Sequence, residues 1–231
     1  MTPWYEGPLA ALAVRAAAPP PAGRGTQDVS GPDPESDRLG DAAVAVQHTP
    51  RSPVETHVPR AVPDTAEGRS AADIARTLAS YAAGTPLVVL DAPYVLTLLD
   101  RELRRHRHTP LPACLGVRTL CVLDPVLLDR RLDRTAAAGG SRRGTAQLCA
   151  AYGVSAPRDG TVQEEAVAAL ALARALGRRF APRLTGLTPA ALHTLQAIWF
   201  AAERDAPVPW FSRGTRRSAD HIWPLRPPSA A

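Results

Sequence analysis

Acidic side chains that could bind a divalent cation occur at two places in this sequence. Asp91 follows the apolar run 86–90, and Glu164 and Glu165 stand early in an expected helix over 161–180. Mg²⁺ and Mn²⁺ take oxygen ligands, so metal-assisted hydrolysis requires several carboxylates converging on one cleft. A simpler interpretation is favoured at both places. Asp91 fits the N-cap of the next helix, and the two glutamates fit solvated charges on an outward face.

Histidine and cysteine offer weaker candidates for metal binding. His106 and His108 are two residues apart in a run of arginines, which is poor electrostatics for a cation site, so surface histidines are favoured. Three cysteines, Cys114, Cys121 and Cys149, have no metal-ligand spacing, and their odd, low number argues against a disulfide framework. Reduced thiols in a cytoplasmic protein are expected.

All the lysine-plus-arginine charge is arginine, and it gathers in two groups. The formal net charge is +5 and the sequence pI is near 9.7, while lysine and asparagine are absent. That composition indicates GC-rich coding, typical of a high-GC bacterium. Arginine clusters suit phosphate contacts, but they also suit a solvated basic face at a helix C-terminus, and both interpretations stay open. The groups are Arg101, Arg104, Arg105 and Arg107, and Arg130, Arg131, Arg134, Arg142 and Arg143.

The elements that must position these residues alternate along the chain. Short apolar runs predict strands at 8–14, 42–46, 86–90 and 120–123, with an irregular edge strand and loop in 48–67. Helical periodicity and caps predict helices at 71–83, from 92 onward, and at 125–134, 145–152, 161–180 and 189–204, with Ser70 and Thr188 as N-caps. Strands early in the chain, with helices between and after them, predict an α/β layered domain.

One domain over 1–205 is expected, followed by a tail over 206–231 that wraps the surface. Polar and proline-rich residues in 17–37 predict a mobile loop. No run approaches the roughly 18 apolar residues that cross a bilayer, and the N-terminus lacks the basic and apolar regions of a signal peptide. A soluble, cytoplasmic protein is therefore expected.

Several stretches in order resemble the DEDDh branch of 3′–5′ exonucleases, the group that includes the DNA polymerase III epsilon proofreading subunit, in its actinobacterial form. They span nearly the whole chain. The stretches are Trp4–Leu12, Pro32–Arg38, Asp91–Leu96 with Arg101–His106, Gly144–Val154, the helix with Gln196 and Trp199, and the ending Trp223–Pro227. The resemblance implies a ribonuclease H-like mixed central sheet flanked by helices, with an extra C-terminal helix.

The family's chemistry is phosphodiester hydrolysis with two Mg²⁺ or Mn²⁺ ions held by four carboxylates, and a histidine that takes a proton from water. The resemblance maps none of these residues onto a suitable side chain here. A shifted placement of the first motif puts Thr26 and Asp28 there instead, which recovers at most one carboxylate. The mapped positions are Ala13, Arg15 and Val95 for three carboxylates, Val162 for the histidine and Val167 for the last aspartate.

The expected function is therefore that of a catalytically inactive homologue, with no metal cofactor. Its expected partner is single-stranded nucleic acid or a replication or repair protein, with no membrane. Candidate nucleic-acid contacts are Tyr94, which the resemblance places beside the cleft, and Arg101, Arg104, Arg105, Arg142 and Arg143. The alternative is an active metal-dependent 3′–5′ exonuclease on DNA or RNA, with displaced ligands such as Asp28, Asp91 or Glu164.

Overall fold

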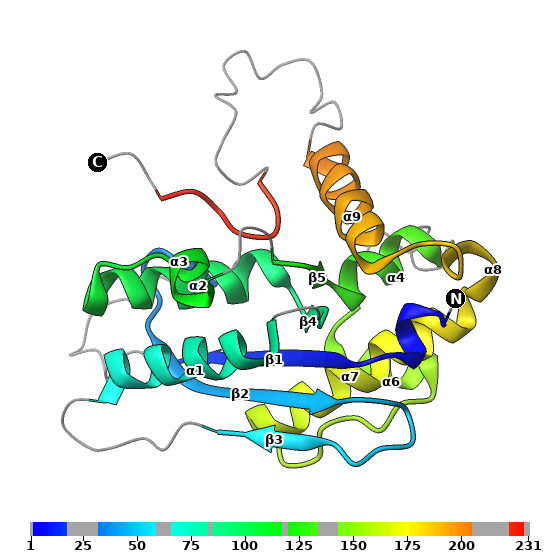
Figure 1. Cartoon of the computed structure of the whole chain (residues 1–231), viewed down its shortest axis with the longest axis horizontal. Coiled ribbons are helices and arrows are strands. Elements are labelled where there is room, and N and C mark those ends of the chain that lie inside the picture. Colours follow the sequence, from blue (N-terminus) through cyan, green and yellow to red (C-terminus); the bar gives the residue numbers. More distant parts are fainter. Residues whose placement is uncertain are drawn as a thin grey trace, which may run out of the picture.

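The computed structural model describes residues 2–17, 32–58, 66–82, 85–116, 120–133, 143–204 and 222–228. Its strands form a five-stranded mixed sheet with helices on both faces (Figure 1). In sheet order the strands are β3 (Glu55–His57), β2 (Leu39–Gln47), β1 (Leu9–Ala16), β4 (Leu87–Val89) and β5 (Val122–Leu123).

Strand direction divides the sheet into two halves. Pairs β1–β2 and β2–β3 are antiparallel, whereas β1–β4 and β4–β5 are parallel. This order and these directions are those of the ribonuclease H-like fold, so the predicted fold class is confirmed.

Helices follow the parallel strands and cover both faces of the sheet. The C-terminal helix α9 stands beside β5 and α4 (Figure 1). The helices are η1 (Trp4–Glu6), α1 (Ala66–Ala82), α2 (Ala92–Arg107), α3 (Leu111–Leu115), α4 (Pro125–Leu132), α6 (Thr145–Tyr152), α7 (Val162–Arg179), α8 (Ala181–Leu184) and α9 (Pro189–Arg204).

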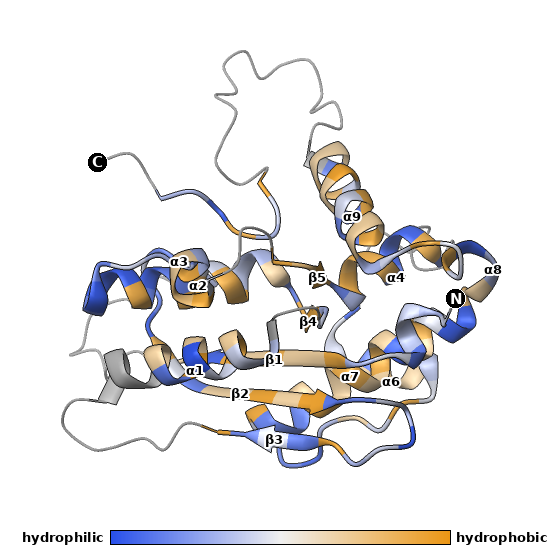
Figure 2. Ribbon diagram, viewed as in Figure 1, coloured by the Kyte–Doolittle hydropathy of each residue, from blue (hydrophilic) through white to orange (hydrophobic). Residues whose placement is uncertain are grey.

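Two hydrophobic clusters occupy opposite faces of the sheet because side chains alternate along each strand. On β1, Leu12 faces the cluster built with α1, α2 and α3, whereas its neighbours Ala11 and Ala13 face the cluster built with α7. Figure 2 shows the apolar colour along β1 and β2, and a more hydrophilic β3 at the edge of the sheet. The core therefore lies on both sides of β1, as expected for a central strand.

Small residues let α7 lie close to the sheet. Buried alanines of β1 and β2 meet buried alanines of the helix: Ala11, Ala13, Ala43 and Ala45 on the strands, and Ala166, Ala169 and Ala173 on α7. Gly177 continues this contact one turn later, where the ring of Tyr5 occupies the space that a Cβ would need. Close packing at these positions fixes how far α7 lies from β1.

Helix ends agree only partly with the sequence prediction. Thr188 accepts a hydrogen bond from Ala191 N at 3.2 Å, which confirms it as the cap of α9. Ser70, predicted as the first cap, instead lies within α1, which begins at Ala66. Most of the predicted loop 17–37, residues 18–31, lies outside the described residues. No helix in the described ranges is long and apolar enough to cross a membrane.

Substitution of Gly177 by alanine tests the close contact between α7 and the N-terminal turn. Alanine normally favours a helix over glycine. Here its Cβ would lie 2.4 Å from Cγ of Tyr5, which is buried and packs edge-on against Trp4. We expect Gly177→Ala to lower the free energy of unfolding by about 2 kcal/mol, measured by urea denaturation.

Gly186→Ala is the matched control, because nothing lies within 4 Å of the Cβ it would add. We expect that variant to stay within about 0.5 kcal/mol of the wild type. Equal stability of the two variants would contradict a tight contact at Tyr5.

Candidate functional site

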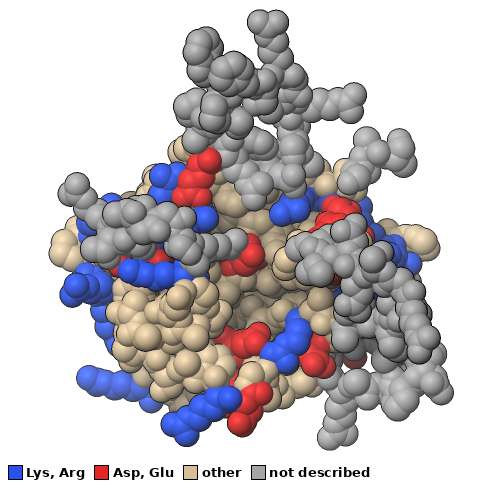
Figure 3. Space-filling view, turned by 180° about the vertical axis from the view of Figure 1, so that it is seen from behind, with Lys and Arg blue, Asp and Glu red and all other residues tan. Residues whose placement is uncertain are grey.

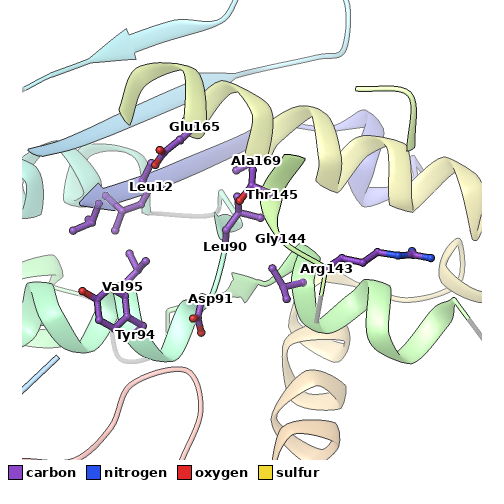
Figure 4. A pocket seen from close by; sticks show the side chains of 13 residues that line it. Leu12, Leu90, Asp91, Tyr94, Val95, Arg143, Gly144, Thr145, Glu165 and Ala169 are labelled. Atoms are coloured by element: carbon purple, nitrogen blue, oxygen red, sulfur yellow. The ribbon is translucent and has the colours of Figure 1, made fainter. Parts of the chain in front are cut away.

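A cleft of about 400 Å³ opens where β1, the start of α2, the start of α6 and the first turns of α7 meet (Figure 4). Hydrocarbon forms much of its wall, and two carboxylates reach it from different elements. Its lining is Leu12, Ala13, Val14, Leu90, Asp91, Tyr94, Val95, Val126, Arg143, Gly144, Thr145, Glu165 and Ala169. Ala13 and Val95, two positions mapped from the resemblance, therefore lie in one cleft although 82 residues separate them in the sequence.

An ion pair joins β1 to α7 at this cleft. Nη2 of Arg15 lies 2.6 Å from Oε1 of Glu165, and the same guanidinium donates to the backbone carbonyl of Gly160. Glu165 lines the cleft, so its prediction as a solvated outward charge is wrong. The error arose because a helix over 161–180 does not reveal which face meets the sheet. The pair places a positive charge beside a cleft carboxylate.

Val162 and Val167, the other two positions mapped from the resemblance, do not line the cleft. Glu165 and Ala169, one turn apart on α7, face it. Val167 is about 200° around the helix from Glu165 and lines a separate outer groove, together with Glu164. Val162 is buried in the core cluster between α7 and the sheet. The acidic side chain of α7 that reaches the cleft is thus Glu165, two residues before Val167, the position mapped to the last aspartate.

Asp91 enters the cleft in an unusual backbone conformation. It precedes α2 with φ 56° and ψ 57°, the left-handed region that aspartate tolerates better than most residues. The predicted side-chain cap is wrong, because no capping hydrogen bond from Asp91 is present. Asp124 fulfils that role: its Oδ2 accepts from Ala92 N at 3.0 Å, and its Oδ1 accepts from Val126 N at 2.9 Å. One buried carboxylate therefore caps both α2 and α4.

These side chains do not fit the two-metal chemistry implied by the resemblance. Such a site needs a cluster of oxygen ligands. Within the described ranges no three histidine, cysteine, aspartate or glutamate side chains are grouped to hold a metal ion. The two carboxylates of the cleft are Asp91 and Glu165, and Glu165 is neutralised by Arg15. The displaced-ligand candidate Asp28 lies outside the described residues.

Arg101, predicted as a phosphate contact, is buried inside the protein. Its side chain is 7% exposed, and its guanidinium donates to both carboxylate oxygens of Glu35, at 2.8 and 2.7 Å, and to Oδ2 of Asp100 at 2.8 Å. A phosphate would have to displace these partners, so this part of the prediction is wrong.

The other candidate contacts are also engaged within the protein. Arg104 pairs with Asp100 at 2.6 Å, and Arg105 pairs with Glu102 at 3.1 Å. Arg143 pairs with Asp129 and Asp133, and Figure 4 shows its side chain directed away from Asp91 and Glu165. Arg142 lies outside the described residues. Figure 3 accordingly shows basic and acidic side chains intermixed over the face opposite to that of Figure 1.

Tyr94, the candidate for base stacking, lines the cleft with its ring and hydrogen-bonds with its hydroxyl. Its Oη donates to Oδ2 of Asp37 at 2.7 Å. Burial, and then the hydrogen bond to Asp37, raise the pKa of the Tyr94 hydroxyl well above its ordinary value. Tyr94 therefore stays protonated and ties α2 to the 32–38 segment.

Two fully buried carboxylates on α2 organise its charged end, and the sequence analysis did not identify them. Asp100 accepts from Arg101, from Arg104 and from the backbone N–H of Leu111. Glu102 accepts from four further residues: Arg38, Leu39 through its backbone N–H, Arg105 and His106. A usable signal was present, since both acids lie between the apolar positions Leu99 and Leu103 of one helix.

Comparison with protein-family models finds no match, and comparison with curated proteins finds none. The ribonuclease H-like fold and the cleft described above are therefore the basis for a functional conclusion.

Glu102→Gln tests the buried network. Burial alone would raise the pKa of Glu102, but hydrogen bonds from Arg38 and from Leu39 N outweigh it and hold the pKa below its ordinary 4.5. We expect the variant to lose about 3 kcal/mol of unfolding free energy near neutral pH, because its arginine partners keep their positive charge and lose the carboxylate that balanced it. A depressed carboxyl pKa contributes stability above 4.5 that disappears as pH falls through the folded-state pKa. The difference between wild type and variant should therefore shrink in acid, as measured by urea denaturation across pH.

Asp73→Asn supplies the control, since Asp73 pairs with Arg76 on an exposed helix surface. We expect a change below about 1 kcal/mol at every pH. If Glu102→Gln behaved like this control, the buried network would not stabilise the fold.

Proposed function

We propose that this chain is a non-hydrolytic relative of the DEDDh 3′–5′ exonucleases that acts by binding, as a protein-interaction module. The observation that carries the proposal is the Arg15–Glu165 ion pair at a cleft where the mapped carboxylate positions are Ala13 and Val95. A guanidinium paired with the cleft glutamate supplies the positive charge that a cation would otherwise supply. Two cations beside Arg15 would be repelled.

A protein partner is favoured over nucleic acid by the state of the arginines. The described candidates for phosphate contact, Arg101, Arg104, Arg105 and Arg143, each have carboxylate partners within the chain. Binding to single strands also draws on aromatic platforms, and aromatic residues make up 5% of this sequence. The described arginine clusters are thus balanced by carboxylates of the same chain, and the net charge of +5 does not mark them as a phosphate-binding face.

Isothermal titration with Mn²⁺, beside digestion of 3′-labelled single-stranded DNA, tests the loss of catalysis. We expect no binding heat and no cleavage from the wild type. The triple variant Ala13→Asp, Arg15→Glu, Val95→Asp adds carboxylates around Glu165 and removes the competing guanidinium. We expect it to bind Mn²⁺, which also shows that the cleft can accommodate a cation once its charges are changed.

Glu165→Gln guards against a contaminating nuclease. Metal-dependent digestion from the 3′ end by the wild type that disappears in Glu165→Gln would sink the proposal and favour an active exonuclease with Asp91 and Glu165 among its ligands. Digestion that persists unchanged in Glu165→Gln would come from elsewhere than this cleft.

A further inference from the structure

The chain's last described segment, residues 222–228, forms a strap across α2, with β5 and α9 alongside (Figure 1). Its sequence is Ile-Trp-Pro-Leu-Arg-Pro-Pro, so three of its positions lack a backbone N–H. It forms no helix or strand. The strap is therefore held by its buried side chains and by hydrogen bonds between its backbone and side chains of α2.

Trp223 is the apolar anchor of the strap. It is 7% exposed, belongs to the hydrophobic cluster that contains Phe200, and its ring centroid lies 4.9 Å from that of His193. Leu225, two residues on, packs against the same cluster. The prediction that the tail merely wraps the surface is wrong at this point, because the indole is inserted into the core.

Side chains of α2 form hydrogen bonds with the strap's backbone. Arg226 N donates to Oγ1 of Thr97 at 3.1 Å. Nη2 of Arg101 donates to the carbonyls of Pro227 at 2.7 Å and Arg226 at 3.3 Å. Glu35 and Asp100 also hold the guanidinium of Arg101, so contacts outside the strap orient this donor as well. A proline-rich segment offers mainly carbonyl acceptors, and this groove supplies a fixed donor for them.

The anchor is less than ideal, which bears on whether it can be replaced. The indole Nε1 of Trp223 is buried and has no hydrogen-bond partner among the described residues. A buried donor left unpaired costs free energy, so the strap binds less tightly than its burial suggests. The strap belongs to no helix or strand, so it is held only by the contacts of its own residues.

We propose that the groove formed by Thr97, Arg101, His193 and the surrounding cluster recognises a proline-rich segment with a tryptophan anchor on a partner protein. The chain's own strap fills the groove in cis and must be displaced. An aromatic side chain buried in a pocket is a frequent anchor of protein interfaces, and Arg101 adds a donor for the carbonyls that a proline-rich segment presents. Because the strap and the groove belong to one chain, the strap competes intramolecularly and sets a threshold that a partner must exceed.

Fluorescence anisotropy with a labelled peptide of residues 220–229 tests the proposal on the full chain. We expect Trp223→Ala, whose own strap has lost its anchor, to bind the peptide at least about tenfold more tightly than the wild type does. A peptide with alanine in place of its tryptophan should not bind. In the Trp223→Ala background, Thr97→Val should weaken peptide binding, whereas Thr194→Val, on the exposed side of α9, should not.

A second design keeps the proposal testable if Trp223→Ala does not fold. A specific protease sequence inserted within 205–221 leaves the strap intact until it is cut. We expect the cut strap to exchange with labelled peptide in the native protein. Absence of both binding and exchange would overturn the proposal and make the strap a permanent part of the core. A concentration-dependent dimer that forms by exchange of straps would also overturn it, because the occupant would be a second copy.

Discussion

The structure depends most on the buried pairing of two α2 carboxylates with arginines around them. Asp100 and Glu102 are fully buried, so their charges must be matched within the protein. Without partners, the cost of removing these carboxylates from water would destabilise the fold. Two partners come from separate segments, Arg38 just before β2 and Leu111 at the start of α3. Arg101, on α2 itself, pairs with Asp100 and also holds Glu35 and the strap. One helix end thereby contacts three other parts of the chain: the stretch that leads into β2, the start of α3 and the strap.

This arrangement changes the meaning of a basic composition. Arginine suits internal pairing because its planar, always charged group can donate to several acceptors at once. Arg101, Arg104 and Arg105 use that capacity on carboxylates and backbone carbonyls of the same molecule. This cluster of arginines therefore stabilises the fold, and the overall charge of the chain does not indicate a nucleic-acid-binding surface.

The cleft follows a different rule, that of close approach. Alanines on β1, β2 and α7 bring the helix near the sheet, and this short distance lets Arg15 on β1 reach Glu165 on α7. The turn after β4 brings Asp91 to the same cleft. Asp124, rather than Asp91, accepts the hydrogen bond from the first backbone N–H of α2. The site is a product of packing between elements far apart in the chain, and its charges are balanced by the protein itself.

Hydrophobic alternation, helical periodicity and residues such as Thr188 by themselves determined the α/β class, the strands β1, β2, β4 and β5, and most helices, because these signals act between neighbours in the chain. The identities of Ala13, Arg15 and Val95 likewise determined that hydrocarbon and a cation stand where the resemblance expects carboxylates. Only the tertiary structure decided that Glu165 rather than Val167 faces the cleft, that Asp124 caps α2 in place of Asp91, and that Arg101 is buried. Each of these depends on which partner a side chain meets across the fold, and that partner lies tens of residues away, beyond the reach of any local pattern.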